Sequence, residues 1–339
     1  MFWLVLYCWI VGVVAPRPAT QHVRTREQLL LGRTTEKTQK IRVNLLVEFE
    51  KWLFPQIGQV TLESLARKHI DVLSDYLEDY MVHMYVTRQS RRAAAETLNM
   101  VVQQFGWLKS SLAGPWNIIR AWEGQEPPTH HPPLPLPILR ALVACALAWQ
   151  WPKLGVLLAL GFFALLRPAE FIGLRRQDLS LPEDHLELDV VYVRVGLPKT
   201  RFRSALNQHV RVDEPGIASW IAWMLRCTPM YQRIWNGSLA AFRKRYDLLQ
   251  RSVLGKVCFL PSSLRPGGAT YLFRLFNEDL VRLQWRGRWR SFRMLEIYVQ
   301  ELGAAQVWMR FSLEVRQGVL FLGDCFSSVV FACRPVGSP

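Results

Sequence analysis

The spacing of apolar side chains predicts amphipathic helices in the first third of the chain. In the segment TEKTQKIRVNLLVEFEKWLF, which begins near Thr35, the apolar residues Ile41, Leu45 and Phe49 recur every fourth position. Pro55 is expected to end this helix, because proline lacks the N–H that a helix interior needs. Two later segments, TLESLARKHIDVLSDYLEDYMVHMY and SRRAAAETLNMVVQQFGWL, repeat the pattern. We therefore expect a small helical bundle with one buried face on each helix.

A proline-rich stretch separates this bundle from the rest of the chain. Residues 123 to 137 read EGQEPPTHHPPLPLP, in which neither a helix nor a central strand can continue. Such composition predicts a semi-rigid linker between two domains. The helical pattern then returns in ILRALVACALAWQWPKLGVLLALGFFALL, where the run from Leu154 to Leu166 is apolar throughout. That run predicts a buried core helix, since it is too short to span a membrane.

The period of the pattern changes from helical to strand-like between His185 and Val212. The segments LELDVVYVRV and NQHVRV alternate apolar and polar residues, and GLPKTRFRSA lies between them. This arrangement predicts a β-hairpin with Lys199 at or near its tip. The expected fold is therefore mainly α with a small β-hairpin or sheet, an α+β class.

These patterns divide the chain into five segments. We expect an apolar and basic N-terminal extension at 1–34, a helical bundle at 35–122, the linker at 123–137, a second domain at 138–302 and an extension at 303–339. The role of the last segment stays open among an oligomer-docking tail, a pair of strands and mis-joined coding sequence.

The charge of the chain points to a polyanionic partner. The formal net charge is +15, and arginine supplies most of the basic residues. Arginine suits phosphate because its planar guanidinium donates two parallel hydrogen bonds and stays charged. The stretch from Ser263 to Tyr298 carries seven arginines and no lysine. A basic surface without a specific partner is the alternative.

Cysteine usage and the N-terminus bear on the cellular compartment. The six cysteines lie far apart with no CxxC pair, which indicates reduced, buried thiols in an intracellular protein. No metal site is expected, and the adjacent His130 and His131 are interpreted as a solvated loop. The first residues, MFWLVLYCWIVGVVAPRPA, are apolar but lack the positive start of a secretory signal. A secretory route nevertheless stays open as an alternative.

Several residues are candidates for chemistry on a phosphodiester, although each also has an ordinary structural interpretation. Cleavage by a tyrosine needs a phenolic oxygen, cations on the phosphate oxygens and a proton donor for the leaving oxygen. Taken alone, Arg167 is best interpreted as a cation at the C-terminal end of the buried helix. Tyr298 is likewise best interpreted as a core residue, on one helical face with Leu295, Val299 and Leu302.

The order of short motifs along the chain favours the chemical interpretation of these residues over the structural one. The segment ALLRPAEFIGLRRQDL resembles the first arginine box of the tyrosine recombinase (phage integrase) family, with Arg167, Glu170, Leu174 and Asp178 at matching positions. The segment PKTRFRS is similar to the strand-borne lysine of the same family, which corresponds to Lys199. The resemblance implies a helical core-binding domain followed by a catalytic domain at 138–302.

The second half of the resemblance ends on the tyrosine. SLRPGGAT is similar to the second arginine box, with Arg265 at the arginine position, and FNEDLVRLQWRGRWRSFRMLEIY resembles the segment that ends on the nucleophile. Trp289 stands nine residues before Tyr298, which is the family spacing between its histidine-or-tryptophan position and the tyrosine. GGAT and GRW are similar to eukaryotic mobile-element members. Ser262 and Pro266 replace two family histidines, and serine cannot change charge near neutral pH.

The resemblance implies a reaction and its partners. Tyr298 would attack a DNA phosphate to form a 3′-phosphotyrosine, as in site-specific recombination or integration. Arg167 and Arg265 would bind the phosphate oxygens, and Lys199 would protonate the leaving oxygen. Trp289 would pack against the phosphate or donate its indole N–H, with Glu170 and Ser262 in support. The partner would be double-stranded DNA, bound by a homo-oligomer in the nucleus, and no metal or other cofactor is implied.

Further arginines are expected to contact the DNA backbone rather than to take part in the chemistry. They are Arg88, Arg91, Arg92, Arg282, Arg286, Arg288, Arg290 and Arg293. Two alternatives to an active enzyme stay open. One is a catalytically impaired DNA-binding protein with the recombinase fold, and the other is a secreted or membrane-associated protein in which the motifs are coincidental.

Overall fold

The computed structural model describes residues 34–58, 60–127, 131–185, 189–196, 208–214 and 216–332. Contacts between residues divide the chain into two compact units, with the boundary between Pro128 and the following residue. Each unit has its own hydrophobic core.

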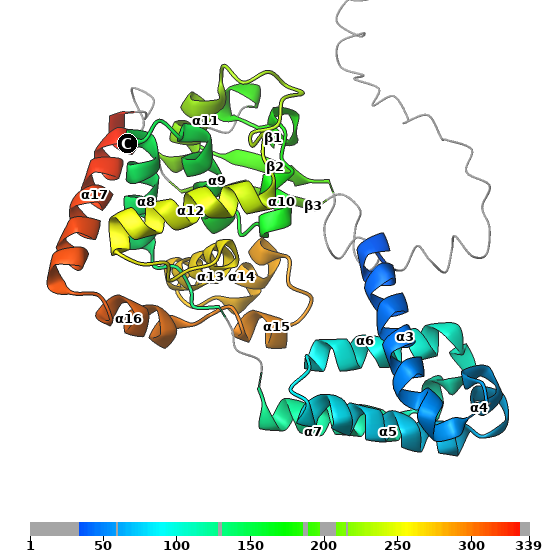
Figure 1. The fold of residues 1–339 in the computed structure, drawn as a ribbon. Coiled ribbons are helices and arrows are strands. Elements are labelled where there is room, and N and C mark those ends of the chain that lie inside the picture. The colour runs from blue at the N-terminus through cyan, green and yellow to red at the C-terminus, as the bar shows by residue number, and fades with distance from the viewer. Residues whose placement is uncertain are drawn as a thin grey trace, which may run out of the picture. The chain divides into compact units, whose positions relative to one another are not determined.

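The first unit is a bundle of helices (Figure 1). Its helices are α3 (Glu36–Ile57), α4 (Leu62–Lys68), α5 (Ile70–Val86), α6 (Arg91–Gln104), a 3-10 turn (Gly106–Ser110) and α7 (Ala113–Gln125). Thr35 caps α3 by accepting a hydrogen bond from the Thr38 N–H at 3.2 Å. The core of this bundle is built from side chains such as Phe49, Leu73 and Leu77, all fully buried.

Two expected boundaries in this unit were wrong. Pro55 lies inside the last turn of α3 and does not end it; the helix continues to Ile57 and stops at Gly58, whose φ is +61°. Proline disfavours a helix interior, but α3 tolerates Pro55 close to its end, whereas Gly58 adopts a positive φ that does not continue a right-handed helix. The second predicted segment is also divided, because His69 leaves helical geometry between α4 and α5.

The second unit is mainly helical with one small sheet (Figure 1). Its helices are α8 (Leu136–Ala148), α9 (Pro152–Phe163), α10 (Pro168–Ile172), α11 (Ile217–Leu225), α12 (Leu239–Leu254), α13 (Leu264–Leu275), α14 (Leu280–Gly287), α15 (Phe292–Glu296), α16 (Glu301–Met309) and α17 (Leu313–Ala332). Short 3-10 turns cover Arg176–Asp178, Pro182–Asp184 and Pro261–Ser263. The strands are β1 (Leu179–Ser180), β2 (Val191–Val195) and β3 (Gln208–Val212).

The sheet is antiparallel with the order β1-β2-β3. Val193 pairs with Leu179 on one side and with Val210 on the other. Alternate residues of β2 are buried, as the period of two predicted. The predicted pairing of β2 with β3 is confirmed. Strand β1 was not predicted, because two residues are too few to show an alternation of apolar and polar side chains. Lys199 lies outside the described residues.

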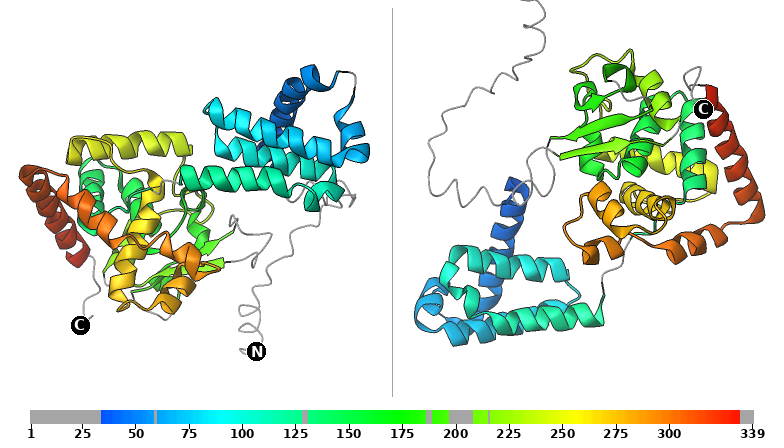
Figure 2. Two further views of the ribbon diagram at one scale, coloured as in Figure 1. Left: turned by 90° about the horizontal axis from the view of Figure 1, so that it is seen from below. Right: turned by 180° about the vertical axis from the view of Figure 1, so that it is seen from behind.

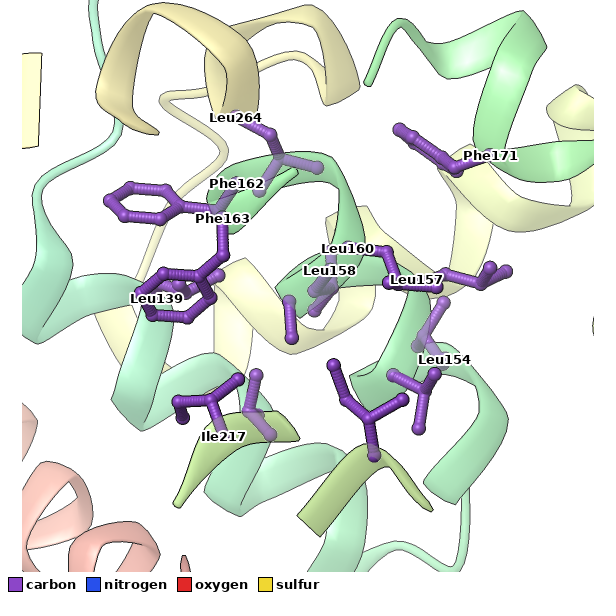
Figure 3. Close-up of a cluster of buried hydrophobic side chains, with 14 of the residues drawn as sticks. Leu139, Leu154, Leu157, Leu158, Leu160, Phe162, Phe163, Phe171, Ile217 and Leu264 are labelled. Carbon is purple, nitrogen blue, oxygen red and sulfur yellow. The ribbon is translucent and has the colours of Figure 1, made fainter. Parts of the chain in front are cut away.

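Helix α9 forms the centre of the second core, as its apolar sequence predicted. Side chains on all of its faces are buried, and Leu157, Leu158 and Phe162 lie among those of neighbouring helices (Figure 3). A helix that is apolar all round must be covered on every side. Helices α8, α11 and α13 provide this cover.

The contact between α9 and α13 depends on glycine. A Cβ added to Gly268 would lie 2.0 Å from the carbonyl oxygen of Phe162. The obstacle is backbone, which cannot swing aside like a side chain. We therefore expect Gly268→Ala to lower the free energy of unfolding by about 1–3 kcal/mol, as overpacking does. Urea unfolding of this variant beside Gly255→Ala, which meets no atom within 4 Å but has a φ of +73°, would separate a packing cost from a backbone cost. A wild-type midpoint for Gly268→Ala would contradict this account.

The last segment of the chain belongs to the second unit. Helix α17 runs beside α8 in each view (Figure 1, Figure 2), and its Val319, Phe326 and Val330 join the same core cluster. Phe326 meets the ring of Trp220 edge-on at 5.0 Å. The pair of strands considered for this segment was therefore wrong. By length and composition alone, α17 could also cross a membrane, and it is the one helix of the described ranges with that property.

The proline-rich segment and the cysteines differ in part from expectation. Helix α7 continues to Gln125, and Leu134 is fully buried in the second core, so the ends of the expected linker belong to the two units.

Of the cysteines in the described part of the chain, Cys145 is buried, whereas Cys227 and Cys325 are exposed. The expectation of uniformly buried thiols was wrong.

Candidate active site

Residues far apart in the sequence meet in the second unit. Arg167 stands at the start of α10, Arg265 lies in the first turn of α13, and Trp289 and Tyr298 follow α14 and α15. Two turns in left-handed geometry shape this region: φ is +52° at Leu165 and +58° at Arg288. Non-glycine residues adopt such angles rarely, which makes both turns specific features of the fold.

Arg167 and Glu170 form a local pair at the start of α10. The Arg167 N–H donates to Glu170 Oε2 at 2.9 Å, and Arg167 Nη1 donates to Glu170 Oε1 at 2.9 Å. Pro168 occupies the first helical position, where the missing N–H costs nothing. Helix α9 already ends at Phe163. The interpretation of Arg167 as a cation at the C-terminus of that helix was therefore wrong.

Arg265 is almost fully buried, with 2% of its surface exposed. Its Nη2 donates to the Gly287 carbonyl oxygen at 2.7 Å, whereas its Nε and Nη1 have no hydrogen-bond partner. The guanidinium carbon lies 4.9 Å from the Trp289 ring centre and 5.4 Å from that of Tyr298. Buried donors without acceptors are costly. Arg265 therefore has the character of a preformed anion-binding group.

A third arginine joins these two. Arg288 Nη2 donates to Glu170 Oε2 at 3.0 Å, and Arg288 Nη1 donates to Gln208 Oε1 at 3.1 Å. Its side chain is only 10% exposed. From the sequence, Arg288 was expected to contact the DNA backbone. No local pattern indicated its contact with Glu170, because the two residues lie far apart in the chain. Glu170 thus accepts from both Arg167 and Arg288.

The electrostatics of this cluster are dominated by burial and by like charges. Burial, followed by the nearby charges of Arg167 and Arg288, lowers the pKa of Arg265 to about 9. Burial alone would raise the pKa of Glu170, but Arg288 and Arg167 outweigh it, so that pKa lies below its usual range. Arg265 and Glu170 are therefore both charged near neutral pH, and the guanidinium groups of the cluster outnumber its carboxylate.

Tyr298 lies in a turn after α15 and not on a helix. Its backbone carbonyl accepts from Thr270 Oγ1 at 3.3 Å, and its ring centre lies 5.1 Å from that of Trp289. The expected helical face was wrong, since α15 ends at Glu296 and Leu302 is 71% exposed. The tyrosine is half-buried, and the buried Trp289 Nε1 has no hydrogen-bond partner. The turn thus places the Tyr298 ring beside Arg265 and Trp289, which both carry buried donors without hydrogen-bond partners.

Glycine is required where the chain passes this cluster. A Cβ on Gly287 would lie 1.6 Å from Cζ3 of Trp289, and the Gly287 carbonyl is the one that Arg265 holds. Ser262 lies in the 3-10 turn directly before α13 and is half-buried. Its supporting role, like the general-acid role of Lys199, stays a prediction.

The remaining arginines are not gathered into this cluster. Arg286 pairs with both carboxylate oxygens of Asp213, and Arg282 lies over the Phe276 ring at 4.1 Å. Arg290 and Arg293 are exposed. In the first unit, Arg88 and Arg92 are exposed and Arg91 contacts Glu123 at 3.5 Å. Contact of these arginines with DNA stays a prediction.

Comparison with solved structures agrees with the fold. The chain matches no family profile and no curated protein. It is similar to XerH site-specific recombinase in its post-cleavage complex with palindromic difH, with a TM-score of 0.53, 16% sequence identity and coverage of 80% of each chain. The pre-cleavage complex of XerH with difH gives a TM-score of 0.52, 16% identity and coverage of 79% of each chain. It is also similar to Tn1549 transposon integrase bound to transposon right-end DNA (0.50, 12%, covering 78% of this chain and 98% of that one).

These similarities establish the architecture of the chain. It has a tyrosine recombinase-like fold of the α+β class, with a helical unit followed by a unit that carries the small sheet. Identities of this size show the fold alone.

Proposed function

We propose that this protein cleaves and rejoins DNA strands through a 3′-phosphotyrosine intermediate, as in site-specific recombination or integration. The observation that carries the proposal is the position of the Tyr298 ring next to the guanidinium of Arg265, whose Nε and Nη1 are buried without acceptors. A phosphodiester placed there would supply those acceptors and lie beside a phenol. Fold similarity to recombinases supports the same class of reaction.

The reaction would proceed in two reversible steps. The phenolic oxygen of Tyr298 gives up its proton and attacks the phosphorus, and the bond from phosphorus to the 5′ oxygen breaks. The leaving 5′ oxygen takes a proton from Lys199, the general acid that the resemblance implies. Arg265 and Arg167 stabilise the negative charge that accumulates on the non-bridging oxygens, which preorganised donors in a dry site do well. Trp289 Nε1 adds a donor. A 5′ hydroxyl from another strand then gives up its proton and attacks the phosphotyrosine. The bond from phosphorus to the Tyr298 oxygen breaks, and that oxygen is protonated again.

The complexes formed by the similar proteins are consistent with this proposal. XerH was solved with its difH substrate before and after cleavage, and the Tn1549 integrase was solved on transposon end DNA. We extend DNA as a partner to the present chain as part of the proposal. Its excess of basic residues supports that extension.

Binding to duplex DNA should depend steeply on salt. Each phosphate contact releases counterions, so log K falls by roughly 0.9 per contact for each unit of log salt. Replacing the exposed Arg290 and Arg293 with Gln should make that slope shallower, by roughly 0.9 for each arginine that binds a phosphate in the wild type. Fluorescence anisotropy with a labelled duplex across a salt series measures this. Affinity that does not change with salt would contradict a backbone-binding role.

A second candidate function is that of a catalytically impaired DNA-binding protein. The observation that favours it is Ser262, which stands where the resemblance places a histidine. Serine donates a hydrogen bond but cannot carry a proton charge near neutral pH. Under this alternative the chain binds duplex DNA with the same salt dependence but forms no covalent adduct.

The finer identity of the protein is also part of the proposal. The GGAT and GRW motifs support a eukaryotic mobile-element origin, and with it a nuclear location and assembly of several copies on DNA. Imaging of a tagged chain tests the location. Finding the chain in the secretory pathway would instead favour a role for its apolar first residues.

A further inference from the structure

Three guanidinium groups and one carboxylate share the candidate site. Glu170 accepts from Arg167 at 2.9 Å and from Arg288 at 3.0 Å, and Arg265 lies within electrostatic range of both arginines. The side chain of Glu170 is only 3% exposed to solvent. In such surroundings one carboxylate offsets one cation at close range. Two positive charges therefore remain for a ligand.

These two positive charges match in number the two negative charges of the reaction's transition state. A DNA phosphodiester carries one negative charge, and attack by a phenolate brings a second onto the phosphorane oxygens. If Arg288 were absent, Glu170 would offset Arg167, and only one net positive charge would face that dianion. The ion pair of Arg288 with Glu170 thus leaves the charges of both Arg167 and Arg265 for the phosphate.

We infer that Arg288 is a positioning residue that neutralises Glu170, so that Glu170 can orient Arg167 without cancelling its charge. This inference rests on the proposed function and assigns a role in the chemistry to an arginine that the sequence analysis placed on the DNA backbone. The geometry of the turn agrees with a specific role. Arg288 adopts a φ of +58°, which directs its side chain to Glu170 and Gln208 at a backbone cost.

A charge-neutral substrate distinguishes this role from a purely structural one. A methylphosphonate at the cleavage position replaces one charged oxygen with a methyl group, so its transition state carries one negative charge fewer. We expect Arg288→Gln to slow cleavage of the phosphodiester by about tenfold or more, which is less than the roughly hundredfold loss typical of a donor that contacts the oxyanion directly. Cleavage of the methylphosphonate should fall much less. A structural defect would slow both substrates by the same factor, which would overturn the inference.

The second arm removes the charge that Arg288 offsets. Gln at position 170 still presents an oxygen to Arg167 Nη1, so Arg288→Gln combined with Glu170→Gln should recover most of the phosphodiester rate. No recovery would show that Arg288 acts in some other way. Arg286→Gln is the matched control, because Arg286 lies in α14 just before Arg288 and pairs with a different carboxylate, that of Asp213. Its ratio of phosphodiester to methylphosphonate rates should equal that of the wild type.

A third measurement needs no catalysis. Inorganic phosphate should raise the melting temperature of the wild type and of the double variant more than that of Arg288→Gln, because at one concentration the ligand that binds more tightly stabilises the folded state more. Equal shifts in all three proteins would overturn the inference. The two proposals fail differently: absence of any wild-type adduct removes the proposed function, whereas an adduct with unchanged Arg288→Gln rates removes only the role of Arg288.

Discussion

Replacing Tyr298 with Phe is expected to abolish the covalent protein–DNA adduct while leaving duplex affinity nearly unchanged. The change removes only the phenolic oxygen, and the ring keeps its contacts with Trp289 and Arg265. Loss of the attacking atom stops covalent catalysis altogether. Denaturing gels with a nicked suicide duplex detect the adduct, and anisotropy reports the affinity.

The matched control for this variant is Tyr231→Phe. Tyr231 is in the same unit and 78% exposed, so its loss should leave the amount of adduct unchanged. Equal adduct formation by Tyr298→Phe and wild type would mean that another residue is the nucleophile. A loss of DNA affinity by the Phe variant would mean that the phenolic oxygen binds rather than reacts.

Replacing Arg265 with Met should slow cleavage by about a hundredfold or more. Arg265 supplies two buried donors without protein partners, and losing one preorganised donor to a developing oxyanion typically has an effect of that size. The melting temperature of the DNA-free protein should be maintained, because a buried charge with unsatisfied donors contributes little to stability. Single-turnover cleavage and thermal unfolding measure the two quantities.

Arg293→Met provides the comparison for Arg265. Arg293 is an exposed arginine in α15, the helix directly before Tyr298. Its replacement should weaken binding without changing the single-turnover rate at saturating DNA. An Arg265→Met rate within a few-fold of wild type would exclude a role in transition-state stabilisation. Unfolding of the variant would assign Arg265 a structural role instead.

The long periodic elements were predictable from the sequence because the spacing of apolar residues along the chain shows which faces of these elements are buried. Helix α9 is apolar on all sides and lies at the core, and β2 alternates as a strand with one buried face should. Strand β1 was missed because a pair of residues has no period. The end of α3 was misplaced because Gly58, and not Pro55, adopts the geometry that stops the helix.

The candidate site was predictable only where motifs preserve local order. Arg167, Arg265 and Trp289 were predicted in this way and their catalytic roles stay predictions, whereas the packing of Arg265 against Trp289 depends on the tertiary fold. Tyr298 has helical spacing from its neighbours, yet the chain leaves the helix there, and the Gln300 N–H donates to Thr270 Oγ1 at 3.1 Å. That bond joins segments thirty residues apart, so no local pattern records it.

Arg288 shows the limit of sequence patterns most clearly. Its place in an arginine-rich segment favoured a solvent-facing contact with DNA, whereas its side chain is buried against Glu170. The partner lies 118 residues away, and a left-handed turn aims the arginine toward it. Charge composition predicts an anionic ligand, but only the fold distinguishes arginines that face solvent from those that hold a buried carboxylate.

The most direct test of the account is to locate the residue that carries the DNA phosphate. The adduct with a suicide duplex is digested with nuclease and trypsin, and the modified peptide is sequenced by mass spectrometry. Trypsin should release residues 294–310, MLEIYVQELGAAQVWMR, in which Tyr298 is the one tyrosine. The account predicts a nucleotide 3′-phosphate on Tyr298 in this peptide. A phosphate on any other residue, or no adduct under conditions in which the duplex is bound, would contradict it.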